Sequence, residues 1–320
     1  MQAIQVRQTG GPDVLTPTEL EQPQPGPGEI RVELAATGVN FIDVYHRTGL
    51  YPKPLPFIPG SEGAGRVVTV GPGVESVKVG DRVASTDLPG AYAQFAVVPA
   101  DRVVPVPDGV SDDLAAAVLL QALTAHYLVH DSYPVKAGDT VVVHAAAGGV
   151  GLLLTQLATK LGARVIGTVS TLEKEKLARD AGAAEVIGYD NVTEDVRRLT
   201  DGRGVPAVYD GVGRSTFDAS LSSLRPHGTL VLYGQSSGPV PPFDLGRLAR
   251  GGSLRITRPI LGHFVATPEE LTRRSGDVFG WIADGSLSIH IGGRYPLAEA
   301  ARAHTDLQSR KTTGKLLLHP

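Results

Sequence analysis

Hydrophobic and polar positions follow two different patterns along the chain. Residues 1 to about 120 are rich in Gly and Pro and contain short alternating runs such as EIRVELAATGV and GRVVTVGPGVESVKVGDRV, which predict β-strands joined by tight turns. From about residue 123 to residue 262, β-branched runs such as TVVVHA, ARVIGTV and AVYDGVG alternate with helical patterns. Strands separated by crossover helices predict a parallel, doubly wound sheet. Two further helical segments follow, and the first opens on Thr267 and Pro268, residue types that favour a helix start.

The stretch VVVHAAAGGVGLLLTQLA, residues 141–158, passes from a predicted buried strand into a predicted helix through adjacent glycines. Compared with the pattern G-x-G-x-x-G, residues 146–151 keep the second and third glycines and have alanine in place of the first. Gly148 would let a pyrophosphate approach the backbone, and Gly151 would let the helix pack against the sheet. A plain tight turn also explains the glycines alone. Together with the flanking strand and helix, however, they favour a dinucleotide site.

The end of the next predicted strand distinguishes the two nicotinamide cofactors. An NAD site usually has Asp or Glu about 20 residues after the glycines, bonded to the ribose 2′-hydroxyl. Here the chain reads GTVSTLEKEK, with Ser170 at the strand end and Lys174 one turn into the following helix. A hydroxyl and an ammonium could bind a 2′-phosphate, which favours NADPH. In the alternative interpretation, Lys174 and Lys176 belong to a helix face that is exposed to solvent. This interpretation is preferred for Lys176.

Composition narrows the possible functions. The net charge is −3 at pH 7, which gives no general attraction to nucleic acid or to an anionic membrane surface. The chain contains no cysteine, which excludes disulfides, thiolate metal sites and a cysteine nucleophile. No apolar stretch is long enough to span a bilayer and the N-terminus lacks a signal-peptide core, so we expect a cytoplasmic protein.

A set of motifs then points to one family. They are GVNFIDVYHRTGLYP (38–52), PGSEGAGRV (59–67), VGDRV (79–83), HAAAGGVGL (144–152), YDGVG (209–213), YGQSSG (233–238) and TRP (257–259). With these motifs nearly the whole chain resembles the zinc-free quinone oxidoreductases of the medium-chain dehydrogenase/reductase superfamily, which include bacterial NADPH:quinone reductases and zeta-crystallin. The resemblance implies an α/β fold with two domains. A GroES-like β-barrel catalytic domain would span residues 1–122 and be completed by residues 263–320, and an NADP-binding Rossmann domain would span residues 123–262.

The same resemblance implies roles for individual residues. It places Asn40 and Tyr45 beside the nicotinamide, with Asp43 in the same pocket segment as a further candidate catalytic residue. The other cofactor-binding residues that it implies are Thr124 near the nicotinamide ribose, Gly148, Gly149, Val150 and Gly151 at the pyrophosphate, Ser170, Lys174 and Tyr189 at the 2′-phosphate, and Ser236, Ser237 and Arg310 along the cofactor. Simpler interpretations are a structural hydrogen-bonding role for Asp43, an amphipathic strand-end aromatic for Tyr189, and a surface charge for Arg310. Close relatives often have glycine at the position of Ser170, whose hydroxyl would either bind the phosphate or crowd the ribose.

Zinc-dependent members of the superfamily differ at two places. They carry a ligand cysteine around Asn40 and Gly-His-Glu where this chain has Gly60, Ser61 and Glu62. We therefore expect no metal site. His144, beside the glycine turn, is expected to be a buried, hydrogen-bonded core residue rather than a ligand.

Hydride delivery without a Lewis-acid metal requires an acceptor that is already electron-poor, and quinones meet that condition. The predicted function is NADPH-dependent reduction of a quinone without metal. One alternative is NADPH-dependent reduction of α,β-unsaturated carbonyls such as enones or enoyl thioesters. Another is a cofactor-binding protein of the crystallin or RNA-binding type, which the acidic charge balance disfavours. The run SLRITRPIL, residues 253–261, predicts an edge strand of the Rossmann sheet, through which two copies would pair as a homodimer.

Overall fold

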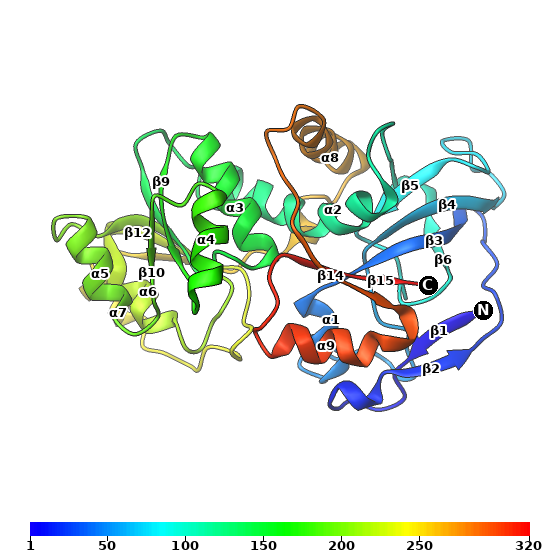
Figure 1. Cartoon of the computed structure of the whole chain (residues 1–320), viewed down its shortest axis with the longest axis horizontal. Coiled ribbons are helices and arrows are strands. Elements are labelled where there is room, and N and C mark those ends of the chain that lie inside the picture. The colour runs from blue at the N-terminus through cyan, green and yellow to red at the C-terminus, as the bar shows by residue number, and fades with distance from the viewer. The chain divides into compact units, whose positions relative to one another are not determined.

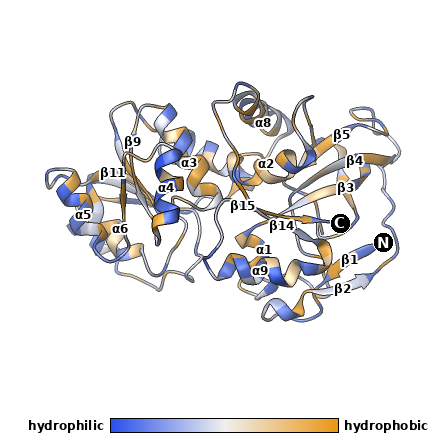
Figure 2. Ribbon diagram, viewed as in Figure 1, coloured by the Kyte–Doolittle hydropathy of each residue, from blue (hydrophilic) through white to orange (hydrophobic).

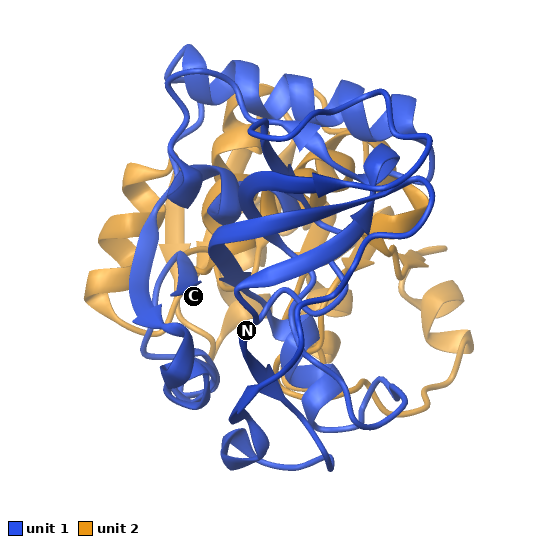
Figure 3. Cartoon of the chain, turned by 90° about the vertical axis from the view of Figure 1, so that its right-hand side faces the viewer, with its two compact units in different colours: residues 1–120, 265–320 blue, residues 121–264 orange.

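The computed structural model describes residues 1–320 and divides into two compact units. Unit 1 comprises residues 1–120 together with residues 265–320, and unit 2 comprises residues 121–264 (Figure 3). The two segments of unit 1 share one sheet, because the C-terminal strand β15 (Lys315–His319) pairs with β3 (Glu29–Val39). No helix of the protein is both long enough and apolar enough to cross a membrane.

Unit 1 is built around strand β3, which pairs with β15, β4 and β6 (Figure 1). Its larger sheet has the order β14-β15-β3-β4-β5-β7, and β1 and β2 form a separate pair. The remaining elements of unit 1 are β1 (Gln2–Gln5), β2 (Thr16–Glu19), α1 (Phe41–Arg47), β4 (Gly63–Val70), β5 (Arg82–Ser85), β6 (Phe95–Pro99), β7 (Val104–Pro105), α8 (Pro268–Ala283), β14 (Ile291–Pro296) and α9 (Ala300–Gln308). Figure 2 shows that β15 is hydrophobic over most of its length, which accords with its place inside the sheet. Helix α2 (Asp112–Tyr127) spans the boundary between the units.

Unit 2 contains a six-stranded sheet in the order β10-β9-β8-β11-β12-β13. All of its strand pairs are parallel, so the predicted parallel sheet is confirmed. The strands are β8 (Thr140–Val143), β9 (Arg164–Thr168), β10 (Glu185–Ile187), β11 (Val205–Asp210), β12 (Leu224–Leu232) and β13 (Arg255–Thr257), and the helices are α3 (Gly149–Lys160), α4 (Leu172–Asp180), α5 (Val192–Leu199), α6 (Phe217–Ser223) and α7 (Gly246–Arg250). Strand β13 lies at the edge of the sheet and pairs with β12, as expected for that run.

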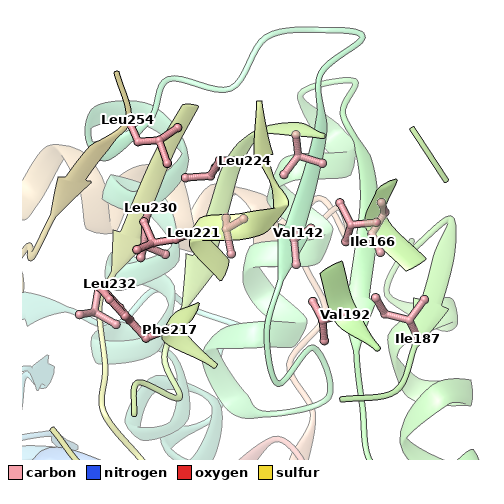
Figure 4. Close-up of a cluster of buried hydrophobic side chains, with 13 residues drawn as sticks. Val142, Ile166, Ile187, Val192, Phe217, Leu221, Leu224, Leu230, Leu232 and Leu254 are labelled. Atoms are coloured by element: carbon pink, nitrogen blue, oxygen red, sulfur yellow. The ribbon is translucent and has the colours of Figure 1, made fainter. Parts of the chain in front are cut away.

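A cluster of buried side chains joins one face of this sheet to helices α5 and α6. Val142 and Ile166 come from adjacent strands, and Val192 and Phe217 come from the helices that cover them (Figure 4). Helices α3 and α4 cover the other face (Figure 1). Burial on both faces explains why the strands have nearly continuous hydrophobic sequences. The glycine turn between β8 and α3 is thus anchored by a fully packed sheet.

Candidate functional site

The glycine turn connects β8 to α3 and leaves the start of α3 without a capping side chain. Gly148 is the N-cap residue, in extended conformation, and no side chain bonds to the helix start. The N–H groups of the first helical turn therefore have no intrahelical acceptor. Gly148, Gly149 and Val150 are partly exposed, so a ligand can reach these groups. A helix start of this kind binds anions such as a pyrophosphate.

Gly151 is buried, and a side chain at its position would overlap the carbonyl oxygen of Ala145. The turn can therefore fold back this tightly only with glycine at 151. A side chain at Gly149 would overlap the side chain of Gln121. Gly151 thus packs closely against the backbone of the turn at Ala145, which explains the need for glycine there.

His144 is a fully buried member of a polar chain beneath the turn. Its Nδ1 lies 3.0 Å from Oγ1 of Thr168, and its Nε2 lies 3.0 Å from Oγ of Ser220. Ser220 donates its own proton to Asp210 at 2.7 Å, so His144 must donate through Nε2 and accept at Nδ1. Burial lowers the pKa of His144, partly offset by the nearby Asp210 charge. The expectation that His144 is a hydrogen-bonded core residue is confirmed.

Tyr189 lies beside the glycine turn although it is 44 residues away from Ala145 in the sequence. The backbone N–H of Ala145 donates to the Tyr189 hydroxyl at 3.1 Å and to Oγ1 of Thr168 at 3.2 Å. Ala145 has a φ of 51°, an uncommon left-handed conformation for a residue other than glycine. The Tyr189 side chain is 37% exposed, so its ring remains accessible at the turn.

Ser170 and Lys174 follow strand β9 with no acidic side chain at the strand end. Thr171 caps α4 by accepting a hydrogen bond from the Lys174 N–H at 3.3 Å, and the Lys174 side chain is half-buried. Lys176 is exposed and pairs with Asp180 at 2.5 Å. The interpretation of Lys176 as a solvent-exposed residue is thus confirmed, whereas Lys174 is less exposed than Lys176.

Ser236 and Ser237 lie in the loop that follows β12. The Ser237 hydroxyl donates to the carbonyl of Val212 at 2.7 Å and accepts from the Ser215 N–H at 3.0 Å. The Ser236 N–H donates to the carbonyl of Gly211 at 3.2 Å. These bonds join the loops after β11 and β12. The structure thus shows a loop-fixing role for the Ser237 hydroxyl.

Most of the predicted cofactor-binding residues of unit 2 lie at the same end of the sheet. The glycine turn follows β8, Ser170 follows β9, Tyr189 follows β10 and the serine loop follows β12. Because the strands are parallel, all of these segments lie at their carboxyl ends. Strand order also reverses between β8 and β11, and ligands of open α/β sheets bind at such a switch point. Thr124 lies on α2, where it is buried.

Asn40 and Asp43 form the start of helix α1 in unit 1. The Asn40 N–H donates to Oδ2 of Asp43 at 2.9 Å, and the Asn40 side chain accepts from the Asp43 N–H in return, which makes a capping box. Asp43 is 1% exposed. Burial raises its pKa to about 6, opposed by the Asn40 N–H bond and the charge of Lys315. Asp43 therefore has the structural hydrogen-bonding role that was the simpler interpretation.

The Asn40 amide is fixed by two buried charged residues, Glu62 and Lys315, whose contacts with Asn40 were not predicted from the sequence. Its Nδ2 donates to Oε2 of Glu62 at 2.9 Å, and its Oδ1 accepts from Nζ of Lys315 at 2.8 Å. Lys315 and Glu62 also form a close ion pair with each other. A side chain at Gly38 would overlap both of them. Since 253 residues separate the pair, no local sequence pattern connects them.

A second buried chain lies behind Asp43. The Tyr92 hydroxyl donates to Oδ2 of Asp43 at 3.1 Å and lies 2.9 Å from Nε2 of His304. His304 then donates through Nε2 and accepts from Arg47, 3.4 Å from its Nδ1. Burial and the Arg47 charge lower the pKa of His304 to about 3, so it is neutral at physiological pH. This chain holds α1 against α9.

Tyr45 and Arg310 also lie in unit 1. The Tyr45 ring is 9% exposed and packs 6.3 Å from the Phe41 ring and 5.3 Å from the Tyr51 ring, measured between centroids. Arg310 is exposed, has a φ of 59° and lies between α9 and β15.

The oxygen atoms around Asn40 are not available to bind a metal ion. The oxygens of Asn40 and Glu62 that could serve as ligands already accept from the Lys315 ammonium. His126 and His130 have the i, i+4 spacing that some helical metal sites use, with ring centroids 4.6 Å apart. No group of three or more His, Cys, Asp or Glu side chains that could hold a metal occurs in the structure.

Comparison with known proteins assigns the family. The family model described as alcohol dehydrogenase GroES-like domain matches residues 26–108, and the model described as zinc-binding dehydrogenase matches residues 149–275. The quinone oxidoreductase of Pseudomonas aeruginosa is 49% identical over 99% of both chains. The chain belongs to the quinone oxidoreductase family of the medium-chain dehydrogenase/reductase superfamily. The match to a zinc-binding description covers residues 149–275 and so includes neither Asn40 nor Glu62.

Solved structures of the quinone oxidoreductase family and its neighbours share this fold closely. A mycobacterial protein complexed with NADPH is 55% identical with a TM-score of 0.98, and the match covers all of both chains. The Escherichia coli quinone oxidoreductase complexed with NADPH is 43% identical with a TM-score of 0.98, again over the whole of both chains. A 2-haloacrylate reductase from Burkholderia is 41% identical over 99% of this chain and 98% of its own length.

Proposed function

We propose that this protein is an NADPH:quinone oxidoreductase that transfers reducing equivalents from NADPH to a quinone without metal, in the cytoplasm. The observation that carries the proposal is the full-length likeness to a quinone oxidoreductase at 49% identity, joined to an uncapped helix start at the switch point of the sheet. The structures of two relatives contain NADPH, which supports the choice of cofactor.

The residues of unit 2 suit a dinucleotide. The N–H groups that begin α3 would bind the pyrophosphate, since they have no intrahelical acceptor. Ser170, Lys174 and Tyr189 would bind the adenosine 2′-phosphate, with the Lys174 ammonium contributing the charge. When bound, NADPH supplies the reducing equivalents. The remaining task of the protein is to orient the reactants and stabilise the oxygen that gains charge.

Unit 1 supplies two candidate donors for that oxygen. Nδ2 of Asn40 donates one hydrogen to Glu62. For its second hydrogen the contact is marginal, because Nδ2 lies 3.5 Å from the Gly38 carbonyl oxygen, at the limit of a hydrogen bond. The Tyr45 hydroxyl is the second candidate. We assign no acid role to Asp43, because its carboxylate is buried and holds the start of α1.

A panel of acceptors tests the proposed function. We expect benzoquinones and naphthoquinones to give the highest kcat/KM with NADPH, and prolonged chelation beforehand to leave the activity unchanged. The likeness to 2-haloacrylate reductase favours the second candidate, reduction of an activated carbon–carbon double bond. If alkenals, 2-haloacrylate or enoyl-CoA are reduced efficiently while quinones are not, that second function replaces the first.

Replacing Lys174 with alanine is expected to raise KM for NADPH about tenfold, or about 1.4 kcal/mol, because one partly exposed charge-assisted contact to phosphate is lost. NADH kinetics should hardly change. Lys176→Ala is the matched control, since Lys176 pairs with Asp180 on the exposed side of the same helix. Equal losses with both cofactors would show that Lys174 supports the fold rather than the 2′-phosphate.

Replacing Tyr45 with phenylalanine is expected to lower kcat for quinones about 10- to 100-fold, because the ring packing is kept while one donor to the charged oxygen is lost. Binding of NADPH, measured by fluorescence titration, should change little. Tyr295→Phe serves as control, because that hydroxyl bonds Asp306 at 2.9 Å within α9. An unchanged kcat in Tyr45→Phe would remove Tyr45 from the reaction.

The exposed edge of β13 supports a homodimer. The strand pairs with β12 on one side, and Ile260 just beyond it is 59% exposed. Pairing of two β13 strands across a twofold axis would satisfy this edge and cover the apolar side chain. We expect light scattering at micromolar protein to give twice the 33.5 kDa mass of one chain. A mass of one chain under those conditions would contradict the dimer.

A further inference from the structure

The ion pair between Lys315 and Glu62 is unusual because both partners are almost completely buried. Lys315 is 1% exposed and Glu62 is 0% exposed. Removing two charges from water is costly, and replacing such a pair by apolar residues is often neutral or stabilising. The pair is therefore poorly explained as a device for stability alone. The place of Lys315 and Glu62, both bonded to Asn40, offers another explanation.

The two charges leave the Asn40 amide with one possible orientation. The Lys315 ammonium can only donate, and it faces Oδ1 of Asn40 at 2.8 Å. The Glu62 carboxylate can only accept, and it faces Nδ2 at 2.9 Å. Flipping the amide would put two donors together on one side and two acceptors together on the other. The pair thus determines the plane of the amide and which of its ends faces each partner.

Glu62 is itself held rigidly, so it is a suitable anchor. Its Oε1 accepts from the backbone N–H of Leu120 in α2 at 2.7 Å, while its Oε2 accepts from both Asn40 and Lys315. Its own backbone carbonyl accepts from Thr37 Oγ1 at 2.7 Å and from the Gly38 N–H at 3.0 Å. Gly38 allows the close approach, since a side chain there would overlap the pair. Strand β3, helix α2 and strand β15 therefore converge on one amide.

We propose that Lys315 and Glu62 are positioning residues that orient Asn40, so that the second hydrogen of its Nδ2 is available to the reacting groups. The inference rests on the proposed function of Asn40 as a donor. Lys315 and Glu62 act through Asn40 and do not themselves contact the acceptor. Their loss should therefore affect kcat more than KM.

Lys315→Met and Glu62→Gln test the proposal, together with the double variant that carries both changes. Each single change leaves a buried charge unpaired and is expected to lower the melting temperature. The double variant removes both charges, so its melting temperature should return toward that of the wild type. Its kcat with a quinone should nevertheless stay about tenfold or more below wild type, a typical cost of losing a supporting hydrogen-bond partner. KM for NADPH should change less than twofold. Lys78→Met, at an exposed lysine, is the matched control.

A second measurement, by NMR, does not depend on enzyme activity. The side-chain amide resonances of Asn40, assigned by their absence in Asn40→Ala, should show slow exchange in the wild type and fast exchange in the double variant. Recovery of wild-type kcat in the stable double variant would show that the pair only balances charge, and would overturn the proposal. Unchanged amide exchange would overturn it as well. If the wild type reduces enones rather than quinones, the proposed function fails, but the amide measurement still decides the role of the pair.

Discussion

Replacing Asn40 with alanine is expected to lower kcat for quinone reduction by about 100- to 1,000-fold, the usual cost of removing one well-placed donor to a developing oxyanion. Two effects combine in this variant. The donor itself is lost, and the Lys315 ammonium and the Glu62 carboxylate each lose a hydrogen-bond partner inside the protein. Steady-state kinetics with saturating NADPH measures the first effect, and thermal unfolding measures the second.

Asn191→Ala is the matched control for this experiment. Asn191 is the N-cap residue of α5, is exposed and makes no side-chain capping bond, so its replacement should change neither kcat nor the melting temperature noticeably. A kcat for Asn40→Ala within threefold of wild type, with protein that is folded and binds NADPH, would show that the amide takes no part in the reaction.

Replacing Gly151 with alanine is expected to weaken NADPH binding about 100-fold, because about two hydrogen bonds to the charged pyrophosphate, each contributing about 1.5 kcal/mol, would be lost. The new methyl group would overlap the Ala145 carbonyl oxygen, so the turn before α3 must open. The N–H groups at the helix start would then no longer converge on a pyrophosphate. The same overpacking should destabilise the fold by about 1–3 kcal/mol. Fluorescence titration with NADPH and thermal unfolding measure the two effects.

Gly280→Ala provides the control, since Gly280 lies within helix α8 and a side chain there would meet no atom within 4 Å. That change should stabilise the protein by about 0.5–1 kcal/mol, because glycine is a poor helix former, and should leave NADPH binding unchanged. Wild-type NADPH affinity in a folded Gly151→Ala variant would mean that the turn is not the pyrophosphate site.

Local patterns in the sequence were sufficient to predict the sheet of unit 2 and the turn that begins its proposed nucleotide site. The β-branched runs, the glycines and the amphipathic helices each lie within a few residues of one another. The helix predicted after the glycine turn is α3, which spans Gly149–Lys160, and β13 is an edge strand as expected. Val141–Val143 are buried on both faces of the sheet, and such strands are easily recognised in a sequence because they form continuous hydrophobic runs.

Helix α2 was not predicted, and the reason is physical. Ala115–Leu119 are all 0% exposed, so the helix is hydrophobic all round and lacks the amphipathic period by which helices are identified. Helix α1 had a detectable sequence signature, because Asn40 followed three residues later by Asp43 is compatible with a capping box. That local pattern favours the structural interpretation of Asp43 over the catalytic one.

The supporting residues of the candidate site could not be predicted from local sequence. Glu62 and Lys315 are 253 residues apart, and His304 is 212 residues from its partner Tyr92. Only the pairing of β15 with β3 brings the C-terminal residues to Asn40. Such contacts depend on tertiary structure rather than on spacing. The resemblance implied roles for Asn40 and Tyr45, while the structure showed the side chains that hold Asn40.

An anaerobic single-turnover experiment on the protein with one equivalent of bound NADPH tests the quinone reductase assignment most directly. On mixing with a benzoquinone, the NADPH absorbance should disappear at a rate that saturates with quinone concentration and is at least about 100-fold lower in Asn40→Ala. The rate should be the same after removal of metals by a chelator. If the NADPH persists in the presence of quinone and is oxidised only when an enone or an enoyl thioester is added next, the quinone reductase assignment is wrong.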